Sequence, residues 1–301
     1  MNPGQPDRPA QDRSPVRLLS PGDIRDLAAQ YGVHPSKSRG QNFVVDAGTV
    51  RRIVNLAERV LDLAPGQRRA LEVGPGFGSL TLGLLAAGWH VAAVEIDPIL
   101  AGALPAIAHA RVPDAQDGAL DVIVDDVLKV RQLPDPPPMA LIANLPYNVS
   151  VPAILHALAT WPSLRGALVM VQAEVAERLV AGPGGRDYGV PSAKLAWYAA
   201  ARQVGRVGRA AFWPVPRVDS ALVALTRRPP PPATAQRQAV FHLIDAAFSQ
   251  RRKMLRSALA NWAGGSERAG SILAEAGIDP TWRAERLSIS DFARLAECKG
   301  E

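Results

Sequence analysis

The stretch ALEVGPGFGSLT, Ala70 to Thr81, decides the fold of this chain. Its pattern predicts a buried strand that ends between Glu72 and Gly74, then a glycine-rich turn, then a helix that begins near Ser79. Glycines in such a turn let the backbone approach a bound ligand at the carboxyl end of the strand, where open α/β sheets bind cofactors. We therefore expect a cofactor site here, with Glu72, Gly74 and Gly76 among its contacts.

A dinucleotide-binding turn is the alternative interpretation of this stretch. Ser79 stands where G-x-G-x-x-G has its third glycine, and a bare match to that pattern is weak evidence in any case. Glu72 within E-x-G-x-G suits a methyltransferase that uses S-adenosylmethionine, because acidic and backbone acceptors can hold the ammonium group of this cofactor. S-adenosylmethionine is therefore the favoured cofactor.

Short apolar runs that alternate with amphipathic stretches predict the rest of the fold. The runs are RALEVG, HVAAVE, LDVIVD, MALIAN and GALVMVQ, between residues 69 and 172. Strands separated by helical patterns indicate βαβ units and a parallel sheet covered on both faces. Two more runs, between residues 202 and 227, are expected to close the sheet with antiparallel strands. The predicted fold class is α/β, a Rossmann-like methyltransferase sheet with a small C-terminal all-α domain.

Composition divides the chain into four parts. Residues 1–30 begin with a polar, Pro-rich segment and are predicted to be a flexible tail. Residues 31–228 hold the Rossmann-like domain, and 229–232 fall in the run RPPPP, which predicts a stiff extended linker. Apolar residues at helical spacing predict a helical domain over 233–301.

Charge and cysteine content limit the function classes. The single cysteine, Cys298, excludes a disulfide framework and a cysteine-based metal site, and we predict no metal. No apolar run approaches the roughly 20 residues that cross a bilayer, so we expect a soluble, cytoplasmic protein with no membrane partner. The formal charge of +6 permits an acidic partner such as nucleic acid.

Two carboxylates follow the next strands of the predicted sheet. Glu95 closes the second strand, where a carboxylate accepts hydrogen bonds from the hydroxyls of a ribose. Asp126, after the third strand, can accept a hydrogen bond from an adenine amino group, although Asp125 competes for that role. These residues fit any nucleoside-containing cofactor.

The stretch LIANLPYNVS, Leu141 to Ser150, places an amide and an aromatic ring at the end of the fourth strand. The Asn144 amide oxygen and a backbone carbonyl of the Leu145-Pro146 turn supply two hydrogen-bond acceptors. Two acceptors can hold an exocyclic aromatic amine, a poor nucleophile, so that its lone pair points at a methyl donor. Tyr147 can stack on the ring of the base. A plain turn former and a packing residue are the alternative interpretation.

Six separated motifs in this order resemble the KsgA/RsmA family of ribosomal RNA adenine dimethyltransferases. The motifs are GQNFVVD, LEVGPGFGSLT, VEID, NLPYNVS, VQAEVAERLVAGPGGRDYG and FWPVPRVDSALVAL. The resemblance spans Tyr31 to Leu295. It implies dimethylation of N6 of two adjacent adenosines in a hairpin loop near the 3′ end of 16S rRNA, with S-adenosylmethionine as the cofactor and a role in small-subunit biogenesis.

The resemblance also assigns residues to the site. It implies that Asn42 and Val44 contact the cofactor, together with Gly74, Glu95, Asp126 and Asn144. It makes Phe212 a second stacking surface beside Tyr147. Trp213 and Arg217 depart from residues that relatives often carry, which leaves the shape of that loop open.

A compact basic cluster lies in the predicted helical domain. Its members are Arg251, Arg252, Lys253 and Arg256. Such clusters neutralise phosphates, so we predict that the helical domain binds 16S rRNA within the immature small subunit. Arg178 and Arg186 are candidate further contacts from a glycine-rich loop. We expect the protein to be a monomer.

Two other functions remain open. An Erm-type 23S rRNA adenine-N6 methyltransferase would use the same chemistry on a different RNA loop. A ribosome-assembly or transcription factor could keep the fold without turnover. The segments FWPVPRVDSAL and QRRKMLRSAL disfavour the first, and the intact Asn144-to-Tyr147 turn disfavours the second.

Overall fold

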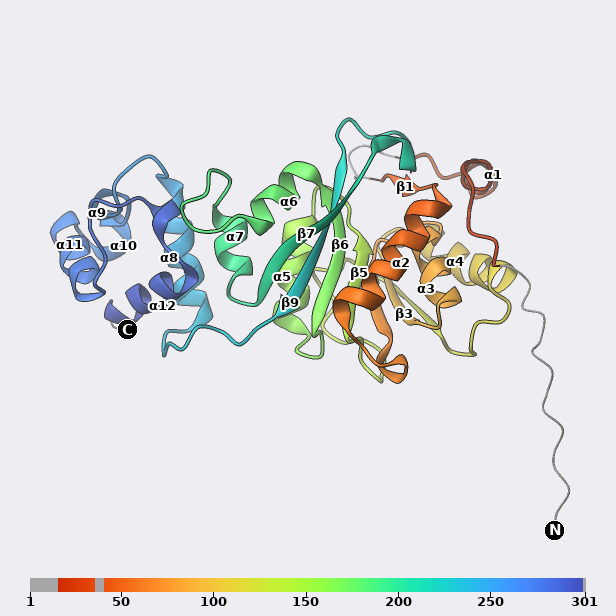
Figure 1. The fold of residues 1–301 in the computed structure, drawn as a ribbon, viewed down its shortest axis with the longest axis horizontal. Helices are drawn as coiled ribbons and strands as arrows, with labels where there is room; N and C mark the ends of the chain where they lie inside the picture. Colours follow the sequence, from red (N-terminus) through yellow and green to blue (C-terminus); the bar gives the residue numbers. More distant parts are fainter. Residues whose placement is uncertain (1–15, 36–40, 300–301) are drawn as a thin grey trace, which may run out of the picture.

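A seven-stranded sheet with the order β4-β3-β2-β5-β6-β9-β7 forms the centre of the computed structural model, which describes residues 16–35 and 41–299. The parallel strands are β2 (Arg69–Val73), β3 (His90–Glu95), β4 (Leu120–Val124), β5 (Ala140–Asn144) and β6 (Gly166–Gln172). Two antiparallel strands, β9 (Ser220–Arg227) and β7 (Ala199–Val207), complete it (Figure 1). The predicted strands and fold class are confirmed.

Helices cover both faces of the sheet. One face packs against α2 (Ala47–Leu61), α3 (Ser79–Ala86) and α4 (Pro98–Arg111), and the other against α5 (Ser150–Thr160), α6 (Ala173–Val180) and α7 (Val190–Leu195). Neighbouring residues of β5 face opposite cores, Leu141 toward α5 and Ile142 toward α2. Burial on both faces explains why the strands are continuous apolar runs. No helix in the described part of the chain is long and apolar enough to span a membrane.

Short elements connect these layers. They are β1 (Phe43–Val44), the 3-10 helices η2 (Pro65–Gln67) and η3 (Arg209–Ala211), and β8 (Phe212–Trp213). β1 and β8 pair antiparallel, with Val44 opposite Phe212. Two segments far apart in sequence therefore form one small sheet beside α2 and α3.

The C-terminal part is helical and lies at one end of the molecule (Figure 1). Its elements are α8 (Arg237–Ser249), α9 (Leu255–Ala258), α10 (Ala260–Ala263), α11 (Ser266–Glu275), η4 (Ala284–Arg286) and α12 (Ile289–Cys298). Leu243 and Phe292 belong to the same apolar cluster as Leu158 of α5. The helical part therefore shares a core with one face of the sheet, and residues 229–232 connect the two parts without helix or strand.

The N-terminal segment differs from its prediction. Residues 1–15 lie outside the described residues, but α1 (Pro21–Gln30) is a capped helix, so the predicted flexible tail over 1–30 is wrong for residues 16–30. Ser20 and Asp23 form a capping box, and Leu19, Ile24 and Ala28 are buried. The capping box and the buried apolar side chains offset the conformational entropy that this segment loses when it becomes helical. The polar composition of the segment did not reveal this stabilisation.

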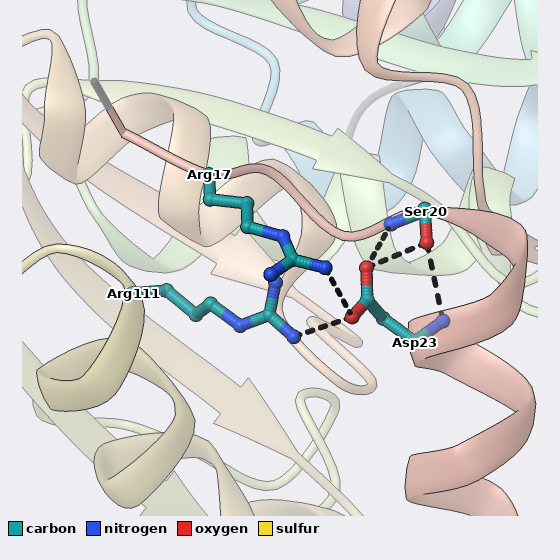
Figure 2. A network of polar contacts seen from close by, with 4 residues as sticks. All are labelled: Arg17, Ser20, Asp23 and Arg111. Atoms are coloured by element: carbon teal, nitrogen blue, oxygen red, sulfur yellow. Dashed lines mark hydrogen bonds and ion pairs between the residues drawn. The ribbon is translucent and has the colours of Figure 1, made fainter.

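Asp23 also ties α1 to the end of α4 (Figure 2). One carboxyl oxygen of Asp23 accepts hydrogen bonds from the backbone N–H and hydroxyl of Ser20, at 2.8 and 2.6 Å. The other accepts from Arg111 Nη2 at 2.6 Å, with Arg17 Nη2 at 3.7 Å. The hydrogen bond from Arg111 is the main cause that holds the pKa of Asp23 far below its ordinary value. Asp23 therefore links three segments as a carboxylate.

We expect Asp23→Asn to lower the free energy of unfolding by about 1–3 kcal/mol at pH 7, because it removes the charge partner of Arg111. A depressed pKa contributes stability above the ordinary pKa of a carboxyl, so the effect is fully present at pH 7. Urea denaturation measures it. Arg17→Gln is the matched control, because the Arg17 side chain is 77% exposed and should contribute less than about 0.5 kcal/mol. Equal effects of both substitutions would contradict this assignment.

Candidate active site

A cavity of about 270 Å³ lies at the carboxyl ends of β2, β3, β4 and β5. It brings together every residue predicted to contact the cofactor: Asn42, Val44, Glu72, Gly74, Gly76, Glu95, Asp126 and Asn144. Leu145, Pro146 and Tyr147 line the same cavity. These side chains come from five separate segments, and the sheet places them within one concave site.

The glycine-rich turn forms the floor of the cavity and requires its glycines. Gly74 and Gly76 have φ values of 67° and 60°, in the left-handed region that other residues adopt at a cost. A Cβ on Gly76 would lie 2.6 Å from the ring of Phe43, which in turn contacts Phe77 at a centroid distance of 5.1 Å. The N-terminal wall of the cavity therefore packs directly on the turn.

Glu95 is held at the end of β3 by two backbone donors. Its Oε2 accepts from the Gly76 N–H at 3.1 Å and its Oε1 accepts from the Asp97 N–H at 3.0 Å. Burial raises the pKa of Glu95, and these hydrogen bonds oppose that shift. Both oxygens keep further acceptor capacity, so the geometry fits a ligand that presents two neighbouring hydroxyls.

Glu72 is a fully buried carboxyl at the inner end of the cavity. Its Oε2 accepts from Thr81 Oγ1 at 2.7 Å, and it forms no ion pair with any described residue. Burial, and to a smaller extent the nearby Glu95, raises the pKa of Glu72 to about 8. A cationic ligand in the cavity would offset this cost, which fits the ammonium group of the predicted cofactor.

The acids after β4 both line the cavity. Asp125 Oδ1 accepts from the Asp126 N–H at 2.7 Å, and Asp126 Oδ1 accepts from the Leu128 N–H at 3.0 Å. Asp126 is half-buried whereas Asp125 is exposed. The fixed, less exposed carboxylate is the better candidate to receive an amino group, so Asp126 stays the preferred residue.

Asn144, the last residue of β5, presents an unused acceptor. Its Nδ2 donates to the backbone carbonyl of Asn42 at 3.0 Å, which fixes the orientation of the amide. Its Oδ1 is buried and has no hydrogen-bond partner among the described residues. A buried acceptor without a partner costs free energy, so this oxygen is available to a donor group that enters the cavity.

The turn that follows holds Tyr147 against β9. The Tyr147 hydroxyl and the Ser220 hydroxyl form a hydrogen bond of 2.9 Å, and Ser220 is buried. Burial raises the pKa of Tyr147, so the phenol stays protonated at neutral pH. The ring is thus fixed at one wall.

The backbone of the same turn offers a second acceptor. The Pro146 carbonyl accepts from the Val149 N–H, which leaves the Leu145 carbonyl as the second candidate acceptor of the turn.

Phe212, the predicted second stacking surface, lies in β8. It is 1% exposed and belongs to the apolar cluster that packs against α2 and α3. It is not among the residues that line the cavity, and a second stacking surface at Phe212 stays a prediction. Trp213, the next residue, stacks on Phe43 at a centroid distance of 6.4 Å.

The basic cluster lies on the turn after α8 and in the first turn of α9. Arg251, Arg252, Lys253 and Arg256 are all exposed. Arg251 Nη2 donates to the Arg186 carbonyl at 2.6 Å, and Gly184 N–H donates to the Glu285 carbonyl at 2.7 Å. The glycine-rich loop is therefore attached to the helical part rather than extended over the cavity. Arg178 pairs with Glu174 on the surface of α6.

Comparison with known proteins places this geometry in a family. The family model described as ribosomal RNA adenine dimethylase matches residues 34–300. The chain belongs to that family. Ribosomal RNA small subunit methyltransferase A of Thermobifida fusca is 57% identical over 286 residues, 95% of this chain and 98% of that protein. The protein of the same name from Kineococcus radiotolerans is 58% identical over 279 residues, 93% and 91% of the two chains.

Solved structures support the fold. The 23S rRNA methyltransferase ErmE has a TM-score of 0.61 at 26% identity, over 86% of this chain and 100% of that one. A dimethyladenosine transferase from Plasmodium falciparum has a TM-score of 0.61 at 21% identity, over 93% and 96% of the two chains. The predicted membership of an rRNA adenine dimethyltransferase family is confirmed.

Two positioning residues escaped the sequence prediction. Thr81 lies nine positions after Glu72 and Ser220 lies 73 after Tyr147, yet each hydrogen-bonds to its partner. Both occur inside motifs that the sequence singled out, LEVGPGFGSLT and FWPVPRVDSALVAL. The motifs marked the segments, but only the fold shows which side chains meet.

The pKa of Glu72 predicts how stability depends on pH. Because its pKa rises from 4.5 to about 8 on folding, the native state binds more protons than the unfolded state in this window, and stability falls as pH rises. We expect Glu72→Gln to reduce this slope in the ligand-free protein, by at most about 1.4 kcal/mol per pH unit. Denaturant unfolding between pH 5 and 8 measures it.

Glu174→Gln, on the exposed surface of α6, is the control and should keep the parental slope. A Glu72→Gln variant with an unchanged slope would show that the Glu72 carboxyl is not protonated in the native state.

Proposed function

We propose that this protein transfers methyl groups from S-adenosylmethionine to N6 of two adjacent adenosines in a hairpin loop near the 3′ end of 16S rRNA. The substrate would be the immature small ribosomal subunit in the cytoplasm, and the protein would act as a monomer in subunit biogenesis. The Oδ1 of Asn144 carries the proposal. This oxygen is a buried acceptor that lines the cavity, and no described residue donates a hydrogen bond to it.

The cavity has the groups that S-adenosylmethionine requires. Glu95 would receive the ribose hydroxyls, Asp126 the adenine amino group, and Glu72 the ammonium group. Gly74 and Gly76 allow the backbone to approach, with Asn42 and Val44 at the wall. The bound cofactor supplies a methyl group on a positively charged sulfur.

The chain contributes positioning of the amine rather than acid–base chemistry. Asn144 Oδ1 and the Leu145 carbonyl would accept the two N–H groups of adenine N6, which draws the nitrogen lone pair out of conjugation with the ring. Orientation of two reactants can account for up to roughly 7–11 kcal/mol of barrier reduction. A neutral amide suits this role because the nitrogen becomes acidic only after methylation and then loses its proton.

Tyr147 would stack on the target base from the wall opposite the amide. The hydrogen bond to Ser220 and the proline before it hold the ring in place before the base arrives. A hairpin loop is a suitable substrate because its bases are already partly unstacked, which lowers the cost of extruding one. The exposed cluster at Arg251, Arg252, Lys253 and Arg256 would bind phosphates elsewhere on the rRNA.

An Erm-type activity on 23S rRNA is the second candidate, since the fold matches that of ErmE. Identity of 57% to small-subunit methyltransferase A, against 26% to ErmE, favours the small subunit. Incubation with unmethylated small subunits and, separately, with protein-free 23S rRNA distinguishes them. We expect dimethyladenosine only in the small-subunit rRNA; product only in 23S rRNA, or in neither, would overturn the proposal.

Substitutions at two cavity residues should separate chemistry from cofactor binding. Asn144→Ala should lower kcat at least about 100-fold with little change in RNA affinity, because it removes an acceptor aimed at the reacting nitrogen. Glu95→Ala should instead raise the cofactor Kd about 10- to 100-fold, since charged hydrogen bonds are lost. Single-turnover kinetics and calorimetry measure these effects, and an exchange of the two phenotypes would refute the assignment.

Substitutions of Tyr147 are expected to weaken binding of the RNA hairpin to different extents. Tyr147→Ala should weaken hairpin binding by about 1–3 kcal/mol through the lost stacking. Tyr147→Phe keeps the ring and loses only the bond to Ser220, so its defect should stay below about ten-fold. Ser220→Ala is the matched variant and should reproduce the Tyr147→Phe value in a fluorescence binding assay. Equal losses in the Ala and Phe variants would exclude stacking.

A further inference from the structure

The open edge of the sheet carries an acid-free, arginine-rich segment. Residues 188–218 contain no Asp or Glu, and they include Arg202, Arg206, Arg209 and Arg217. β7 is the edge strand of the seven-stranded sheet, so one side of its backbone has no neighbouring strand among residues 16–35 and 41–299. Neither the cofactor cavity nor the basic cluster of the helical part includes any of these residues.

Arg202 and Arg206, the edge arginines, project from opposite faces of β7. Arg202 pairs with Ala224, which packs in the core on the α2 side, and Arg206 pairs with Ala221, which packs in the core on the α5 side. Paired residues on neighbouring strands point to the same face. Both edge arginines are exposed, and neither forms an ion pair with a described residue. Asp219, the next acid along the chain, lies 3.8 Å from Arg209.

A third arginine lies across the same edge from α2. Arg52 Nη1 donates to the backbone carbonyl of Arg206 at 3.0 Å. A β-bulge between Gln203 and Gly205 bends β7 at this point, and a Cβ on Gly205 would overlap the Arg52 guanidinium. The glycine therefore makes room for a fixed positive charge beside the edge arginines.

The edge leads to the active site. Val207, at the end of β7, pairs with Ser220, and the hydroxyl of Ser220 holds Tyr147. Arg202 lies five residues before Val207, roughly 15 Å along the strand. A polyanion along β7 would therefore end beside the proposed base-binding wall.

We propose that the edge arginines bind the phosphate backbone of the RNA stem that carries the target loop, so that the stem lies along β7 and the loop reaches Tyr147. The proposal rests on the proposed rRNA substrate and specifies how that substrate is held. Exposed arginines that form no ion pair with a described residue give affinity and orientation on RNA without reading its sequence.

Protection of the edge is the competing explanation. Charged side chains on an edge strand prevent it from pairing with another chain. That role would need the same exposure and charge, but it predicts self-association upon their loss and no effect on RNA. The two explanations therefore differ in what is measured.

The test uses Arg202→Gln/Arg206→Gln and two RNA hairpins with the same loop, one with a long stem and one with a stem of a few base pairs. We expect the variant to bind the long-stem hairpin about ten-fold more weakly at moderate salt, with a salt slope smaller by about 1–2. Its Kd for the short-stem hairpin should equal that of the parent. The kcat at saturating RNA should not change.

Two further variants control for charge and fold. Arg202→Lys/Arg206→Lys should keep most of the affinity, and Arg25→Gln, an exposed arginine of α1, should bind like the parent. Parental affinity for the long-stem hairpin, or an equal loss for both hairpins, would overturn the proposal, and self-association by light scattering would then assign these residues to edge protection. A parent protein that transfers no methyl group to either hairpin would instead contradict the proposed function.

Discussion

The hydrogen bond from the amide nitrogen of Asn144 to the carbonyl of Asn42 is the constraint on which the site depends. It joins the end of β5 to the N-terminal wall of the cavity, 102 residues earlier in the chain. It fixes the orientation of the amide through one N–H of the side chain, so the buried oxygen remains as an acceptor toward the cavity. A residue with no charge thereby acquires a fixed direction, which is what a weakly nucleophilic amine requires.

The scaffold supports this constraint from both sides. Phe43 packs on the glycine turn and on Phe77, so the segment that carries Asn42 cannot move without disturbing the cofactor floor. On the other side, β5 pairs with β6 up to Asn144 itself, opposite Met170, and Tyr147 is held by Ser220 of β9. The carboxyls act differently: Glu95 is oriented by backbone donors, whereas burial keeps Glu72 largely protonated at neutral pH until a cation binds beside it.

Features encoded in one continuous stretch could be predicted from the sequence, and those that depend on distant pairing could not. Three such features follow directly after an apolar run that predicts a strand, and all of them line one cavity. They are the glycine-rich turn within residues 70–81, Glu95, and the turn from Asn144 to Tyr147. The burial of Phe212 could not be predicted locally, because it depends on the pairing of β8 with β1, far apart in the sequence. The helix α1 was missed because the prediction of a flexible tail relied on polar composition and did not use the capping box. The hydrogen bond between Asp23 and Arg111 could not be predicted because it joins residues 88 positions apart.

The most direct test is a crystal structure with S-adenosylhomocysteine, the product of the cofactor, and adenosine both bound. We predict that adenine N6 lies within about 3.2 Å of Asn144 Oδ1, with the base parallel to the Tyr147 ring and the Asn42 contact intact. An Asn144 side chain that turns its oxygen to a protein donor, or a base bound with N6 away from it, would contradict the account.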